Sequence, residues 1–212
     1  MKKYFEFNRS NDIVSNPLYL MAEWVSHVFN PVVIACAILL WRAWIVSVPY
    51  PVLILLLCSY VFIPAGSVLF MLYTNRINSI YPKQRKQREK LLVIALGSYC
   101  LGWLMASKMG VEPFLHMVAL VFIIATFFVL CINRYWRISI HCVGVAAATT
   151  LVFSASDDGI LWGILPVILI TWARLYLRAH TLSQVLAGLI LGAIVGFVAL
   201  LKIIGSIDYA IL

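Results

Sequence analysis

The chain has 212 residues, of which 64% are hydrophobic and 11% are charged, and its mean hydropathy is +1.00. Because a soluble domain needs about a quarter of its residues charged, this composition excludes a soluble globular protein and predicts an integral membrane protein. Lys and Arg number 16 against 8 Asp and Glu, which gives a formal net charge of +8. In so apolar a chain these cations must gather in short loops, which favours lipid headgroups or a phosphorylated ligand as partners over nucleic acid.

Continuous apolar segments follow one another along almost the whole chain and predict an all-α, polytopic transmembrane helical bundle. They cover residues 17–41, 51–74, 91–107, 113–132, 138–154, 159–173 and 182–201. Because a span needs about 20 residues, the three shorter segments leave six or seven spans open, with one pair re-entrant or strongly tilted. We expect a single membrane-embedded domain over residues 1–212, in which residues 1–16 form a short basic N-terminal segment at the interface.

The cations are distributed unevenly between the two faces that seven spans would create. Thirteen of them fall in the N-terminal segment and in the loops that begin at Asn75, Asn133 and Arg174, whereas Arg42, Lys108 and Lys202 fall on the other face. By the positive-inside rule the basic face is cytoplasmic. We therefore expect an integral protein of the plasma (inner) membrane with this face toward the cytoplasm.

Two of the apolar segments begin with histidines on this basic face. His180 and Gln184 open the last segment four residues apart, which places them on one face of a helix, and Arg174 precedes His180 by six residues. Ser139 and His141 open an earlier segment. Helix N-termini offer unpaired N–H groups and a positive dipole end, so two of them with adjacent arginines predict an oxyanion or phosphate site.

These residues resemble the type-2 phosphatidic acid phosphatase superfamily, whose signatures read Lys-x6-Arg-Pro, Pro-Ser-Gly-His and Ser-Arg-x5-His-x3-Asp. The spacing Arg174-x5-His180-x3-Gln184 matches the third signature, with Ala173 for Ser and Gln for the final Asp. The string Ser139-Ile-His141 resembles a reduced second signature without its Pro and Gly. The resemblance extends from about residue 76 to residue 196.

The first signature is the least complete of the three. Arg88 is the nearest counterpart of its arginine, with Tyr81 in the place of the lysine and no proline following. Lys83, Arg85 and Arg88 each remain candidates for the phosphate-binding role.

The resemblance implies a phosphatidic acid phosphatase type 2 or haloperoxidase-like helical core and a metal-independent phosphoryl transfer without a cofactor. His180 would attack phosphorus to form a phosphohistidine, and His141 would act as general acid. Arg174, Ser139 and one or more of the first-signature cations Lys83, Arg85 and Arg88 would bind the phosphoryl oxygens. Gln184 would accept the Nδ1–H of His180 as the family's Asp does, but it brings no negative charge.

The expected function is therefore that of a membrane lipid phosphatase acting on a lipid phosphomonoester or pyrophosphate. Phosphatidate, phosphatidylglycerophosphate, lipid A and polyprenyl diphosphates all remain candidate substrates, and the oligomeric state is left open. The alternatives are a phosphatase-like protein that binds phospholipid without catalysis and a small transporter of a phosphorylated solute. His27 and His116 lie outside the signatures and are not selected, and Arg137 and Arg178 are interpreted as lipid-headgroup contacts. Gly188, Gly192 and Gly196 predict close helix packing behind the site.

Overall fold

The computed structural model describes the backbone of residues 16–82, 84–153 and 159–211, and side chains within 16–82, 84–151 and 163–201. Helices dominate these residues, and no strand occurs among them. The helices are α2 (Pro17–Val28), α3 (Pro31–Val46), α4 (Tyr50–Leu57), the π-helix η1 (Cys58–Phe62), α5 (Ile63–Tyr73), α6 (Arg85–Lys108), α7 (Pro113–Asn133), α8 (Ile140–Phe153), α9 (Gly159–Tyr176) and α10 (Leu182–Ile211). The predicted N-terminal interfacial segment lies almost entirely outside the described residues.

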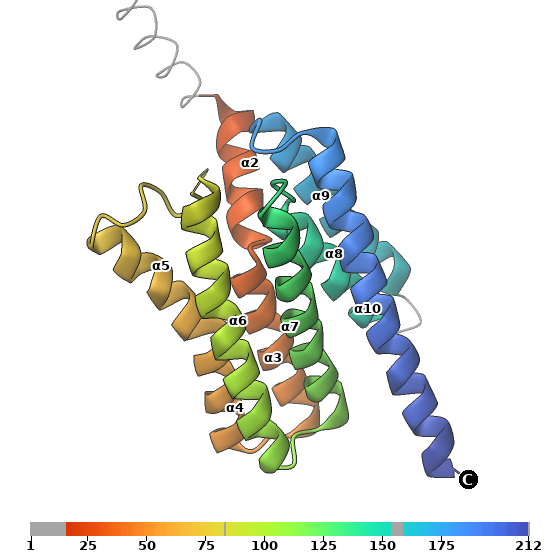
Figure 1. Cartoon of the computed structure of the whole chain (residues 1–212). Helices are drawn as coiled ribbons and strands as arrows, with labels where there is room; N and C mark the ends of the chain where they lie inside the picture. The colour runs from red at the N-terminus through yellow and green to blue at the C-terminus, as the bar shows by residue number, and fades with distance from the viewer. Residues whose placement is uncertain (1–15, 83, 154–158, 212) are drawn as a thin grey trace, which may run out of the picture.

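The prediction of an all-α bundle with apolar, membrane-crossing helices is confirmed (Figure 1). Within the described residues four helices are long and apolar enough to span a bilayer, namely Tyr50–Tyr73, Arg85–Lys108, Pro113–Asn133 and Leu182–Leu201. The pair α2 and α3 gives a fifth span if its two halves cross together, and α8 and α9 are shorter apolar helices. By length and composition, residues 16–82, 84–153 and 159–211 thus contain four or five such spans, as in a polytopic membrane protein. The number of six or seven membrane spans stays a prediction.

The break between α2 and α3 is specified by the local sequence. Asn16 and Asn30 each precede a proline, and each asparagine accepts a backbone hydrogen bond two residues on, from Leu18 and Val32, so that both helices begin with a capped first turn. The second cap interrupts the apolar segment, and the two helices meet at an angle of 51°. The hydropathy pattern predicts one continuous segment over residues 17–41 and does not predict this bend.

The glycine stripe on α10 packs directly against α8, as predicted. A Cβ at Gly188 would lie 2.8 Å from the carbonyl oxygen of Ser139, and a Cβ at Gly196 would lie 2.8 Å from the Cβ of Thr150. A Cβ at Gly192 would clash with the carbonyl oxygen of Val143. Because the helix backbones touch along this line, α8 and α10 are fixed relative to each other.

Gly192→Ala is expected to destabilise the protein, since its Cβ falls on the backbone of α8 and the two helices must separate. We expect a loss of about 1–3 kcal/mol, as for other overpacked sites. Gly66→Ala is the matched control, because Gly66 lies in α5 with no atom within 4 Å of an added Cβ, and there alanine should stabilise by up to about 1 kcal/mol. Thermal unfolding in one detergent compares the two variants. Equal effects of both would contradict the packing.

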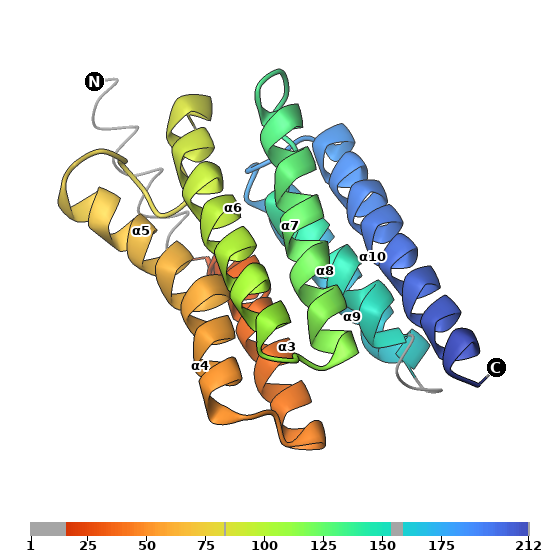
Figure 2. The same ribbon diagram turned by 60° about the horizontal axis from the view of Figure 1, so that its bottom comes forward.

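The chain segments that carry the predicted site meet at one end of the bundle. The start of α6, the loop from α7 to α8 and the loop from α9 to α10 all lie at the upper end in Figure 1, beside α2. Figure 2 shows α4 and α5 running along α6 at one side of the bundle and α10 at the other. At the opposite end, Arg42 forms an ion pair with Glu112 at 2.7 Å.

Candidate functional site

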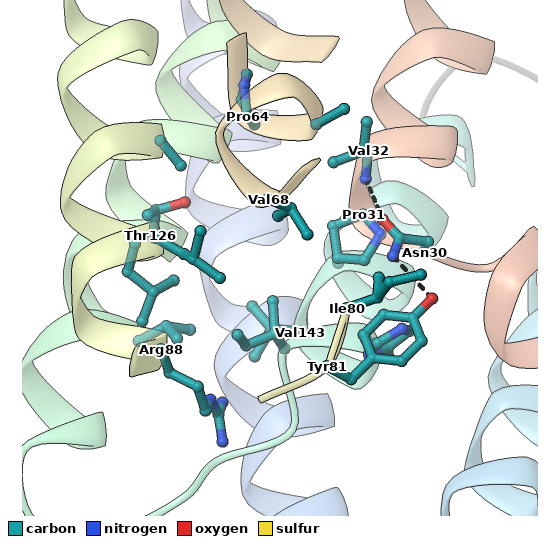
Figure 3. Close-up of a pocket in the computed structure, with 18 of the residues that line it drawn as sticks. Asn30, Pro31, Val32, Pro64, Val68, Ile80, Tyr81, Arg88, Thr126 and Val143 are labelled. Carbon is teal, nitrogen blue, oxygen red and sulfur yellow. Dashed lines mark hydrogen bonds between the residues drawn. The ribbon is translucent and has the colours of Figure 1, made fainter. Parts of the chain in front are cut away.

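A cavity of about 520 Å³ opens at this end of the bundle, between α3, α5, α6, α7 and α8 (Figure 3). Polar groups from distant parts of the chain line one part of it. Most of the other lining side chains are apolar, such as Val68, Leu92 and Phe122. No acidic residue lines the cavity in the described part of the chain. The polar lining comprises His27, Asn30, Ser67, Tyr81, Arg88, Tyr99, Thr126, Arg137, His141, Arg174 and His180.

His180 lies in the short loop between α9 and α10. The backbone N–H groups of Ala179 and His180 donate to the carbonyl of Arg174, and Arg178 adopts a left-handed conformation with φ 48°, which closes the turn. This turn directs the chain back into α10 and leaves His180 against the cavity. His180 and Arg174 both line the cavity.

The tautomer of His180 follows from its contact with Gln184. The Oε1 atom of Gln184 lies 3.0 Å from His180 Nδ1 and accepts a hydrogen bond from the backbone N–H of Thr181 at 3.2 Å. Because the N–H of Thr181 can only donate, this atom is the amide oxygen, and Nδ1 of His180 must carry a proton. The other ring nitrogen, Nε2, then keeps its lone pair and is available as a nucleophile.

The electrostatic surroundings keep this imidazole uncharged. Burial lowers the pKa of His180 from 6.5 to about 4, because desolvation disfavours the imidazolium and the guanidinium of Arg174 adds a like charge, while the hydrogen bond to Gln184 acts in the opposite direction. At neutral pH the ring is therefore neutral, which is the form a nucleophile needs.

Ser139 directly precedes α8 and His141 is the second residue of that helix, which packs against α10. The backbone N–H of Ser139 donates to the carbonyl of Gln184 at 3.3 Å, so the two predicted motifs are joined by a main-chain hydrogen bond. Both side chains are buried, and His141 Nε2 has no hydrogen-bond partner among the described residues. Buried polar atoms are normally satisfied, so this atom, in a side chain that lines the cavity, indicates room for a polar ligand. Ser139, predicted to bind phosphate, is 0% exposed and does not line the cavity.

Arg88 and Arg174 bring two buried guanidinium groups to the cavity, each 6% exposed. Arg88 donates to the carbonyl of Ile138 at 2.9 Å, and Arg174 donates to Ser26 Oγ at 3.3 Å. Arg174 Nε is buried without a partner in the described part of the chain. Within the described part of the chain, neither guanidinium is paired with a carboxylate. The ion pair found there joins Arg42 to Glu112 at the other end of the bundle. A buried, uncompensated positive charge favours an anionic ligand.

The structure distinguishes two of the three cations predicted to bind phosphate before α6 and in its first turn. Arg88 lies one turn inside α6 and lines the cavity, whereas Arg85 is the first residue of α6, is exposed and does not line it. Lys83 lies outside the described residues. Tyr81, in the place of the signature lysine, also lines the cavity.

Two basic side chains that line the cavity, Arg137 and His27, were not selected from the sequence. Arg137, interpreted there as a headgroup contact, lines the cavity and donates to the carbonyl of Ala179 at 3.5 Å, next to His180. His27 reaches the cavity from α2 and contacts the hydroxyl of Tyr81 at 3.0 Å. Arg137 immediately precedes the reduced second signature, a signal that the sequence did offer, whereas nothing around His27 marks it. His116, also not selected, contacts Trp103 and Ser107 away from this cavity.

The described residues contain no group of three His, Cys, Asp or Glu side chains placed to hold a metal ion. Comparison of the chain with protein-family models, with curated proteins and with solved structures gives no match.

Proposed function

We propose that the protein is an integral membrane phosphatase that hydrolyses a lipid phosphomonoester or pyrophosphate, of the type-2 phosphatidic acid phosphatase kind. One observation carries the proposal. Two histidines, His141 and His180, and three arginines, Arg88, Arg137 and Arg174, line a single cavity whose other walls are largely apolar. Such a cavity suits a ligand with an anionic head and a hydrocarbon tail.

The proposed reaction has two steps. In the first, Nε2 of His180 forms a bond to phosphorus while the bond from phosphorus to the leaving oxygen breaks, and His141 gives that oxygen its proton. In the second, His141 takes a proton from a water molecule, whose oxygen attacks the phosphohistidine and releases inorganic phosphate and free His180. Each step transfers one phosphoryl group and one proton, and neither needs a metal.

The guanidinium groups supply the electrostatic stabilisation. Phosphoryl transfer spreads negative charge over the three equatorial oxygens, so fixed cations around them lower the barrier. Arg88 is held by the loop between α7 and α8 and Arg174 by α2, so they need little reorganisation during the reaction. Arg137 adds a third positive charge to the lining of the cavity.

The cellular setting is part of the proposal. A single domain of six or seven spans would place the cavity at the cytoplasmic face of the plasma membrane, because the basic loops surround it. The lipid tail would occupy the apolar part of the cavity toward α5 and α7. Phosphatidate, phosphatidylglycerophosphate, lipid A and polyprenyl diphosphates are the substrates to compare.

Phosphate release from these four lipids by the purified chain in detergent micelles tests the proposal, with and without a metal chelator. We expect release from at least one lipid and no effect of the chelator. Loss of hydrolysis on chelation would contradict the metal-free mechanism. Binding without release would favour the non-catalytic alternative. The absence of a carboxylate at position 184 is the feature of the sequence that agrees with that alternative. Uptake of a phosphorylated solute into vesicles without hydrolysis would favour the transporter.

A further inference from the structure

Tyr81 connects three parts of the site through its hydroxyl group. The Oδ1 atom of Asn30 accepts the N–H of Val32, which leaves the Nδ2 group to donate to the Tyr81 hydroxyl at 3.2 Å (Figure 3). The hydroxyl proton is then free to be donated to Nδ1 of His27 at 3.0 Å. Asn30 and His27, at the break between α2 and α3, thus hold the side chain of Tyr81, which lies in the loop after α5 and lines the cavity.

The ring of Tyr81 lies between two residues of the proposed reaction. Its centroid is 5.1 Å from that of His141, and the two planes meet at 69° in an edge-to-face contact. The guanidinium carbon of Arg174 lies 5.9 Å from the Tyr81 ring centroid. Edge-to-face aromatic pairs and cations over aromatic faces are both attractive, so the ring holds both groups in place.

Contacts of the imidazole ring contribute to the orientation of His141. Its Nε2 atom has no hydrogen-bond partner among the described residues, so no hydrogen bond at that atom fixes the ring. A general acid must nevertheless point its proton at the leaving oxygen. The Tyr81 ring is the aromatic group that contacts His141 in the described structure.

We propose that Tyr81 is a positioning residue for His141, whose imidazole it holds edge-on while Asn30 and His27 hold the tyrosine. The inference rests on the proposed function and adds a residue to its machinery. A leaving group that departs as a stable anion needs no proton, so mispositioning the acid should slow only the release of a poor leaving group.

The test compares nitrophenyl phosphate with a short-chain phosphatidate in single-turnover reactions, which follow the first step alone. With Tyr81→Leu we expect the rate with phosphatidate to fall by about 10²-fold and the rate with nitrophenyl phosphate by less than about threefold. These are rates at saturation, and loss of the contact with Arg174 should raise the half-saturating concentration for both substrates by about two- to fivefold. Tyr135→Leu, an exposed tyrosine in the α7–α8 loop, is the control and should change neither rate.

Tyr81→Phe keeps the ring and loses only the hydroxyl, so it reports on the proposal even if the leucine variant folds poorly. We expect its rate with phosphatidate to fall less than that of Tyr81→Leu and its rate with nitrophenyl phosphate to stay unchanged. A parallel fall with both substrates, or no fall with either, would overturn the role assigned to Tyr81. If the wild-type protein hydrolyses neither compound and none of the four lipids, the proposed function itself fails, which is a different result.

Discussion

Replacing His180 by alanine is expected to lower phosphate release by about 10⁴-fold or more, because no other group can form the covalent intermediate. The structure gives the physical reason: the Nδ1 proton of His180 is directed to Gln184, its Nε2 is free, and burial keeps the ring neutral. The measurement is the initial rate on the best lipid substrate, together with labelling of the protein by a substrate that carries ³²P in the transferred phosphoryl group, quenched in alkaline detergent to preserve the label until it is tested with acid. The wild-type chain should retain acid-labile label, and the variant should not.

His116→Ala is the matched control for this experiment. His116 contacts Trp103 and Ser107 and does not line the cavity, so its loss should leave the rate near that of the wild type. Thermal unfolding of both variants in the same detergent separates loss of chemistry from loss of fold. A His180→Ala protein that folds normally and keeps its hydrolysis would exclude the phosphohistidine.

Changes at Gln184 are expected to move the rate in both directions. Gln184→Leu removes the atom that accepts from Nδ1, so the tautomer with a free Nε2 is no longer selected, and the rate should fall by about 10²–10⁴-fold, by analogy with other oriented histidines. Gln184→Asp keeps an acceptor and adds a negative charge that stabilises the developing imidazolium. Its rate at pH 8 should rise above that of the wild type.

The pH profile distinguishes this charge effect from a change in packing. The wild-type rate should persist on the acid side until the pH approaches the His180 pKa of about 4, below which the nucleophile is protonated. A carboxylate at position 184 favours the imidazolium and raises that pKa, so the acid limb of Gln184→Asp should move to higher pH. An unchanged limb and rate would mean that Gln184 does not orient His180.

The contact between His180 and Gln184 could be predicted from the sequence because the two residues are close together in the chain. They stand four residues apart at the start of α10, so their spacing alone brings the two side chains together. The second motif is also local, and what joins it to the first is the contact between α8 and α10. The spacing of Gly188, Gly192 and Gly196 predicts close packing of α10. The hydrogen bond from the backbone N–H of Ser139 to the carbonyl of Gln184 is known only from the structure.

The choice among Lys83, Arg85 and Arg88 could not be made from the sequence because it depends on where α6 begins. The hydropathy pattern starts the segment at residue 91, whereas the helix begins at Arg85, since charged residues continue a helix beyond its apolar part. Arg88 is thereby one turn deeper than Arg85 and level with Ile138. Tyr81 and His27 meet only through the bend between α2 and α3, a long-range arrangement that no local pattern encodes.

The position of bound vanadate in an experimental structure of the full chain tests the central claim most directly. Vanadate imitates a phosphoryl group in transfer, so the account predicts a bond from vanadium to Nε2 of His180. It also predicts His141 at hydrogen-bond distance on the opposite side and Arg88 and Arg174 around the equatorial oxygens. Vanadate bound away from either histidine, or no binding at concentrations that saturate phosphate sites, would contradict it.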